Sequence, residues 1–147
     1  MKPGDDEYFM RMALTEAQKA ADRDEVPVGA VIVAGKVIIS RAHNLTETLH
    51  DPTAHAEMQA ITAAASYLGG KYLTDCTIYV TVEPCIMCAG ALAWSQVSAI
   101  VYGASDEKKG YTTTGVPILH PKTVVRRGVL AKECSLMMKK FFRKKRE

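Results

Sequence analysis

The chain has 147 residues, of which 48% are hydrophobic and 24% charged, the balance of one globular domain rather than a disordered segment. A chain this long buries roughly 70% of the surface exposed on unfolding, so its cysteines are not needed as disulfide staples. Residues 26–35 and 86–94 are its longest apolar runs, well short of the about 18 residues of a membrane span, and residues 1–16 contain no apolar signal segment. We therefore expect a cytoplasmic protein, with no membrane contact, that forms a single domain over residues 1–147.

The formal net charge of +3 is unevenly distributed along the chain. Residues 139–147 carry six basic side chains and one acidic side chain, which leaves the rest of the chain slightly acidic. A basic segment of this kind either binds a polyanion or forms the solvated end of a helix, and composition leaves both interpretations open.

The first third of the chain predicts a helix followed by a β-hairpin. Apolar residues at helical spacing indicate a helix that Asp5 caps and that ends near Ala21. Residues 28–33 and 36–41 are rich in β-branched side chains and predict two strands joined by a tight turn at Ala34-Gly35.

The remaining chain alternates helical and β-rich segments. These are helix 54–68, strand 78–82, helix 85–94, strand 99–102, strand 124–130 and a closing helix from about Ala131. The strands at 78–82 and 99–102 are nearly continuous apolar runs, which is typical of strands covered on both faces. This order predicts an α/β fold with helices on both faces of one sheet. Helix 85–94 is apolar nearly all round, so we expect it to be buried within the domain or against a second subunit.

Three side chains suited to zinc fall at the starts of two predicted helices. Cys85 and Cys88 are three residues apart, so a helix places both sulfurs on one face. Pro84 suits the N-cap or first position of a helix, where the free N–H groups and the dipole favour thiolates. With His55 as third ligand, two thiolates and one imidazole leave the fourth tetrahedral position for water, as in a catalytic site. We therefore expect one Zn²⁺ per chain.

Glu57 is the candidate general base of this site. It lies two residues after His55, near the metal without being needed as a ligand, and can accept a proton from bound water. The competing arrangement is a closed four-cysteine zinc site that adds Cys76 and Cys134, although neither belongs to a second Cys-x-x-Cys pair.

Six segments carry a family resemblance that covers nearly the whole chain. They are PVGAV at 27–31, HN at 43–44, HDPTAHAE at 50–57, VTVEPCIMCAGA at 80–91, YGASD at 102–106 and FFRKKR at 141–146. In order and spacing these segments resemble the bacterial tRNA-specific adenosine deaminases, which are zinc-dependent members of the cytidine and deoxycytidylate deaminase superfamily.

The resemblance implies a three-layer α/β/α, cytidine-deaminase-like fold with a central mixed sheet of about five strands. It also implies a homodimer with active sites near the subunit interface, and hydrolysis of the wobble adenosine of a tRNA anticodon loop to inosine with release of ammonia. His55, Cys85 and Cys88 match the zinc ligands of the family. Glu57 matches its proton shuttle, which deprotonates the zinc-activated water and passes the proton to the departing ammonia.

The same resemblance implies contacts with the tRNA anticodon stem-loop. Asn44 matches a residue that holds the flipped base, Val28 belongs to the pocket wall, and Ala56 is a further candidate for substrate binding. Asp106 matches a loop aspartate near the RNA backbone. In the basic tail, aromatic rings beside cations are suited to gripping single-stranded RNA, and the candidate contacts there are Phe141, Phe142, Arg143, Lys144 and Arg146.

Residues 111–115 depart from the family, which commonly has a small Ala-Gly-Ser stretch there, so no RNA contact is assigned to this loop. Two other functions compete with the tRNA deaminase. A guanine or free-nucleoside deaminase would share the zinc chemistry but would not need the pocket strand at 27–30 or the basic tail. A non-catalytic zinc- or RNA-binding module would have no use for Glu57 beside an open coordination position.

Overall fold

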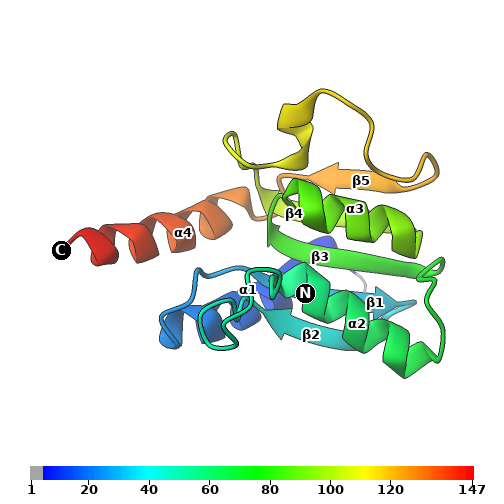
Figure 1. The fold of residues 1–147 in the computed structure, drawn as a ribbon, viewed down its shortest axis with the longest axis horizontal. Helices are drawn as coiled ribbons and strands as arrows, with labels where there is room; N and C mark the ends of the chain where they lie inside the picture. The colour runs from blue at the N-terminus through cyan, green and yellow to red at the C-terminus, as the bar shows by residue number, and fades with distance from the viewer. Residues whose placement is uncertain (1–4) are drawn as a thin grey trace.

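The computed structural model describes residues 5–147, which form five strands and four α-helices (Figure 1). In chain order these are α1 (Asp6–Asp22), β1 (Gly29–Ala34), β2 (Val37–His43), α2 (Ala56–Leu68), β3 (Cys76–Val82), α3 (Ile86–Ser95), β4 (Ala99–Ala104), the 3₁₀ turn η1 (Tyr111–Thr114), β5 (Val124–Arg127) and α4 (Ala131–Arg146). This is the predicted succession of elements, with η1 added.

The five strands form one mixed sheet in the order β2-β1-β3-β4-β5. Strand β1 runs antiparallel to both β2 and β3, whereas β3, β4 and β5 are parallel. The hairpin turn lies one residue later than expected, because Ala34 pairs with Val37 and leaves Gly35 and Lys36 as the loop. Gly35 has a φ of 64°, a conformation that glycine adopts without steric cost.

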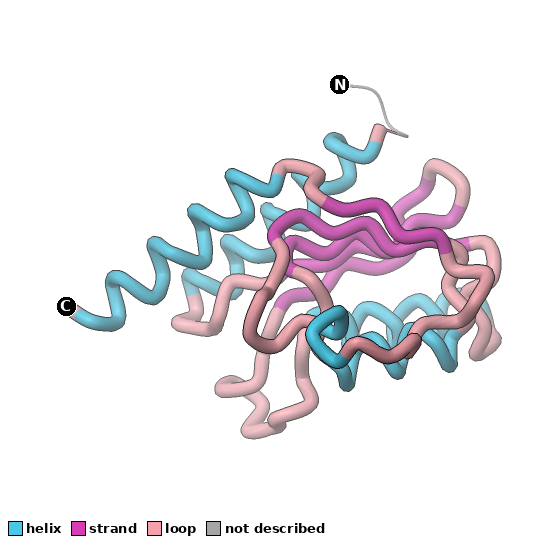
Figure 2. Tube along the Cα trace, turned by 90° about the horizontal axis from the view of Figure 1, so that it is seen from above, coloured by secondary structure: helices cyan, strands magenta, loops and turns pink. Residues whose placement is uncertain are grey.

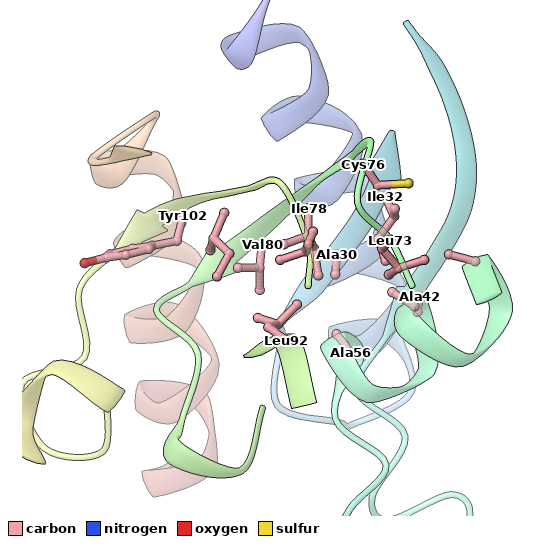
Figure 3. Close-up of a cluster of buried hydrophobic side chains, with 14 residues drawn as sticks. Ala30, Ile32, Ala42, Ala56, Leu73, Cys76, Ile78, Val80, Leu92 and Tyr102 are labelled. Atoms are coloured by element: carbon pink, nitrogen blue, oxygen red, sulfur yellow. The ribbon is translucent and has the colours of Figure 1, made fainter. Parts of the chain in front are cut away.

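Helices cover both faces of the sheet, which confirms the predicted three layers (Figure 2). Helices α1 and α4 pack on one face, and α2 and α3 on the other. Side chains of β3 alternate between the two cores: Ile78 and Val80 face α2 and α3, whereas Tyr79 faces α1. In Figure 3, Ile78, Val80 and Leu92 of α3 lie together in the first of these cores.

Strand β5 is shorter than the predicted segment 124–130 and ends at Arg127. Gly128 and Leu130 both have positive φ angles, which an extended strand cannot accommodate, so the chain turns here into α4. Helix starts are also shifted: α2 begins at Ala56 rather than residue 54, and α3 at Ile86, where Cys85 is the N-cap and Pro84 precedes it. Pro84 therefore lies one residue before the positions predicted for it.

Candidate metal centre and active site

The metal centre is built where the first turns of α2 and α3 meet. His55 is the N-cap residue of α2, Cys85 is the N-cap residue of α3, and Cys88 lies in the first turn of α3. The two helices pack side by side on the same face of the sheet, which brings these ends together. His55 Nδ1 lies 3.6 Å from Cys85 Sγ and 3.5 Å from Cys88 Sγ. The structure thus brings together the three ligands that the sequence spacing predicted.

The geometry of this cluster fits zinc. Zn–S bonds of about 2.3 Å and Zn–N bonds of about 2.05 Å, at a tetrahedral angle, separate the sulfur and nitrogen ligands by about 3.6 Å. Both observed distances agree with that value. Among residues 5–147, His55, Cys85 and Cys88 are the one group of three or more metal-ligating side chains with ligand atoms this close together. Cys76 and Cys134 are buried elsewhere as free thiols, so the alternative four-cysteine site is not formed.

The three ligand side chains shift one another's pKa values. A hydrogen bond from the Cys88 thiol lowers the pKa of Cys85 to about 4, against the opposing effect of burial and with help from His55. The Cys85 thiolate in turn raises the pKa of His55 through a hydrogen bond. Cys88 donates to Cys85 and is largely desolvated, so its pKa is raised strongly. Because metal ligation needs thiolates and a neutral imidazole, protons and a metal ion compete for these three side chains.

Glu57 is the second residue of α2 and is buried, with 4% of its surface exposed. Burial raises its pKa from 4.5 to about 7, with a smaller contribution from the nearby Cys85 thiolate, while the charge on His55 opposes the rise. The carboxyl group interacts with Cys88 but lies outside the three-ligand cluster. The chain thus places an ionisable group beside the ligands that can change protonation state near neutral pH.

Asn44 and Val28 lie next to each other, at the end of β2 and just before β1. The backbone N–H of Asn44 donates to the Val28 carbonyl at 3.1 Å. The Asn44 side chain is buried and already bonded locally, because its Nδ2 donates to the Val26 carbonyl at 3.4 Å and its Oδ1 accepts the N–H of Thr46 at 3.3 Å. A substrate base that binds Asn44 must therefore share or replace these two weak bonds.

The side chain of Ala56 is buried in the core cluster with Ala60 and Ala30, so it does not face a substrate. What Ala56 offers is its backbone N–H at the first position of α2, which has no partner within the helix.

Asp106 follows β4 and shapes its own loop. Its Oδ1 accepts the backbone N–H groups of Lys108 at 3.1 Å and Lys109 at 2.9 Å. A direct RNA contact by Asp106 stays a prediction, and the visible role of its carboxylate is to close this turn.

The tail predicted to bind RNA forms the C-terminal half of α4, which extends beyond the sheet on the side where α2 and α3 begin (Figure 1). Phe142 is 41% exposed, whereas Phe141 is half-buried and lines a hollow with Ala21 and Met137. The two rings meet edge to face, with centroids 5.2 Å apart. The cations Arg143, Lys144 and Arg146 are exposed, as expected for phosphate contacts.

Sequence reasoning did not identify two buried carboxylates beside the site, Glu25 and Glu83. Burial favours the neutral form of Glu25, but bonds from the Thr48 hydroxyl and from the Thr48 and Glu47 N–H groups hold its pKa below the usual value. The motif Glu-Pro-Cys was a signal that could have directed attention to Glu83, whereas nothing local distinguishes Glu25 from a solvated acid.

Comparison with known proteins supports the geometric interpretation. The family model of the cytidine and deoxycytidylate deaminase zinc-binding region matches residues 3–104. The tRNA-specific adenosine deaminase of Bacillus subtilis (strain 168) is 47% identical over 148 residues, which cover 97% of this chain and 91% of the relative.

Two solved structures show the same fold at substantial identity. One, from work on A-to-I editing by tRNA:A34 deaminases at the wobble position of transfer RNA, is 39% identical, with a TM-score of 0.83 over 88% of this chain and 98% of that chain. The other, guanine deaminase from Bacillus subtilis, is 42% identical, with a TM-score of 0.65 over 67% of this chain and 64% of its own. Because the matched family region includes His55, Glu57, Cys85 and Cys88, and the likeness extends over nearly the full chain, this protein belongs to the zinc-binding cytidine and deoxycytidylate deaminase family.

Proposed function

We propose that the protein is a zinc-dependent hydrolase that converts the wobble adenosine of a tRNA anticodon loop to inosine and releases ammonia. One observation supports hydrolytic deamination above all: the buried carboxyl of Glu57 lies beside a three-ligand cluster that leaves a coordination position open. The near-full-length likeness to a tRNA-specific adenosine deaminase supports tRNA as the substrate. We also propose that residues 1–147 act as a single deaminase domain.

The chain's own residues divide the work of the reaction. His55, Cys85 and Cys88 hold the metal, and zinc, when bound, supplies the Lewis-acid chemistry that makes water a nucleophile near neutral pH. Glu57 accepts the proton that water loses as the bond to C6 of adenine forms. It delivers this proton to N1, where the product keeps it, and then transfers the proton of the new C6 hydroxyl to the amino nitrogen, which leaves as ammonia when the C6–N bond breaks. Burial favours the protonated form of Glu57, whereas the charge of His55 favours its carboxylate form. Both protonation states are therefore accessible during turnover.

We assign the recognition of RNA to two regions of the chain. The first comprises Val28 and Asn44, which are joined by a backbone hydrogen bond, together with the backbone of Ala56 beside Glu57, and we assign to it the binding of an extruded base. Asp106, on the loop after β4, is assigned to the same region. The projecting half of α4 adds exposed cations and the exposed ring of Phe142, a combination suited to phosphates and unstacked bases.

We propose a homodimer that forms over α3. The sheet layer covers only one side of this apolar helix and leaves Ile86 57% and Trp94 85% exposed. Trp94 borders a hollow of about 300 Å³ that Ile61, Tyr72 and Ala91 also line. An exposed apolar patch around a tryptophan is typical of a protein interface, and a second copy of this helix would cover it.

The cytoplasm is the compartment that we propose, because all four cysteines are free and tRNA is the proposed partner. No helix in the described part of the chain has both the length and the apolar character needed to cross a membrane.

The competing substrate is guanine or a free nucleoside, which the likeness to guanine deaminase supports. The decisive experiment incubates the zinc-loaded protein separately with tRNA carrying adenosine at the wobble position, with guanine and with cytidine, and measures ammonia and inosine. A matched tRNA with guanosine at the wobble position is the negative control. Ammonia and inosine from the adenosine-bearing tRNA alone support the proposal, whereas turnover of guanine without turnover of the tRNA would replace it.

A further inference from the structure

The loop after β4 is fastened to the end of β3 by one buried carboxylate. Glu83 directly follows β3 and is 4% exposed. Its Oε1 accepts the backbone N–H of Asp106 at 3.0 Å. Its Oε2 accepts both the backbone N–H of Thr112 at 3.1 Å and the Thr112 hydroxyl at 2.7 Å. One side chain therefore binds both ends of the loop between Asp106 and Thr112.

The same loop also contacts the segment that presents the metal ligand Cys85. The backbone N–H of Tyr111 donates to the Pro84 carbonyl at 2.9 Å, and Gly110 forms an isolated antiparallel bridge with Cys85. A Cβ atom at position 110 would collide with the Glu83 carboxylate, so glycine is required for this approach. Cys85 is thereby held from the loop side as well as by the helix that follows it.

The side chains that anchor this loop belong to the stretch that departs from the family. Thr112 supplies the hydroxyl bonded to Glu83, and Tyr111 packs against the core cluster between the sheet and α2 and α3. Tyr111 is half-buried, whereas Thr112 is exposed to solvent with its hydroxyl bonded to Glu83. Within the stretch that departs from the family, Tyr111 and Thr112 thus have a role in attaching the loop to the protein.

We propose that Glu83 and Thr112 form a clasp that holds Cys85 in its ligand position, so that both are positioning residues for zinc. Cys85 lies at the N-cap of α3, where its carbonyl accepts the N–H of Ala89 at 2.8 Å but its own N–H has no partner within the helix. Contacts behind a metal ligand set the orientation of that ligand and its affinity for the metal. Loss of the clasp frees the loop and widens the motion of Cys85, which speeds the release of zinc. This inference rests on the family's zinc site and not on the proposed tRNA substrate.

The test compares two substitutions of one residue in the zinc-loaded protein. Thr112→Val removes the hydroxyl and keeps the shape, whereas Thr112→Ser keeps the hydroxyl and removes the methyl group. The readout is the rate at which zinc passes to an excess of a chromogenic chelator. Partners of metal ligands typically contribute about 10–100-fold to affinity, so we expect Thr112→Val to release zinc up to about tenfold faster and Thr112→Ser to match the parent.

A stability-matched control separates positioning from general destabilisation. Tyr79→Phe removes a hydrogen bond of 2.8 Å to Asp6 on the opposite face of the sheet, away from the metal. We expect Tyr79→Phe to lower the melting temperature and to leave the zinc release rate unchanged. The proposal is overturned if Thr112→Val and Thr112→Ser release zinc at the same rate, or if Tyr79→Phe speeds release as much as Thr112→Val does.

Glu83→Gln provides a stronger version of the same test. Its NH2 group replaces one of the two carboxylate oxygens and so opposes the N–H of either Asp106 or Thr112, while the remaining oxygen still accepts the other. We therefore expect faster zinc release than in Thr112→Val and faster hydrogen exchange at the amide that loses its acceptor. Faster exchange combined with a parental zinc release rate would contradict the clasp, because the loop would then be free while Cys85 stayed in its ligand position. If Glu83→Gln does not fold, the comparison of the two Thr112 variants decides alone.

Discussion

Replacing Glu57 with glutamine should stabilise the metal-free protein at alkaline pH and leave its stability unchanged in acid. Glutamine has the shape of a protonated glutamate but carries no ionisable proton. Burial raises the pKa of Glu57 from 4.5 to about 7, so the folded protein prefers the neutral form that glutamine imitates. Above that pH the parent keeps a buried charge at a free-energy cost that the variant does not bear.

The sign and the size of this effect follow from the pKa. Between about pH 4.5 and 7 the native state retains a proton on Glu57 that the unfolded chain has lost, so the free energy of unfolding falls as pH rises. A rise from 4.5 to about 7 corresponds to roughly 3–4 kcal/mol, at about 1.4 kcal/mol per pKa unit. The difference between variant and parent should therefore be near zero at pH 4, grow through this window and level off above pH 7.

The assay is urea unfolding of both proteins after chelation of zinc, measured at a series of pH values. Subtracting the parent from the variant cancels the titrations of groups that do not interact with Glu57, so that His55 and Cys85 enter the difference only through their electrostatic coupling to Glu57. With zinc bound the difference should shrink, because the cation lowers the pKa of Glu57. A difference that stays constant with pH, or that favours the parent at pH 8, would show that Glu57 is not desolvated as its burial indicates.

Three further expectations concern the site and the proposed dimer. In the zinc-loaded protein, Glu57→Gln should keep the metal but lose about 10⁴-fold in turnover. A general base contributes about 10²–10⁴-fold, and Glu57 also acts as the acid. Ammonia release and bound zinc are measured on the same samples. Cys85→Ala should lose metal and thermal stability together, and full zinc retention by metal analysis would refute its role as a ligand. Trp94→Ala should weaken self-association roughly 30-fold if Trp94 contributes about 2 kcal/mol at the interface, and sedimentation showing the parent itself as a micromolar monomer would contradict the dimer.

The metal ligands could be predicted from the sequence because their geometry is mostly local. Cys85 and Cys88 are brought together by one helical turn, and a single histidine, His55, begins another helix at the same sheet edge. The layers could also be predicted from local patterns. Continuous apolar strands require cover on both faces of the sheet, and helices that alternate with strands along the chain supply this cover.

The parts that could not be predicted depend on contacts between distant segments. Glu83 and Thr112 are 29 residues apart, and no periodicity indicates that one carboxylate will accept two donors from the other. Ala56 was assigned to the substrate from its motif, yet packing against Ala60 turns its side chain into the core. The end of β5 was missed because backbone angles at Gly128 and Leu130, rather than side-chain hydrophobicity, terminate the strand.

The basic tail is where the sequence left two interpretations open, and the structure makes the choice measurable. Residues 143–147 carry four cations, of which Lys145 is already paired with Asp24 and lies over the ring of Phe141. Three cations therefore remain for phosphates, and at about 0.7 per contact their removal should flatten the slope of log affinity against log salt by about 2. The test is to truncate the chain after Phe142 and to measure tRNA affinity between about 50 and 200 mM salt, the range over which phosphate contacts are lost. The measured change in slope is then compared with the expected value of about 2. Lys36→Gln, which removes an exposed cation from the hairpin turn at the opposite end of the sheet, is the control and should leave the slope unchanged. If the truncated protein binds and deaminates tRNA like the parent across this range, the cations are only a solvated helix end, and recognition must come from the residues around Asn44.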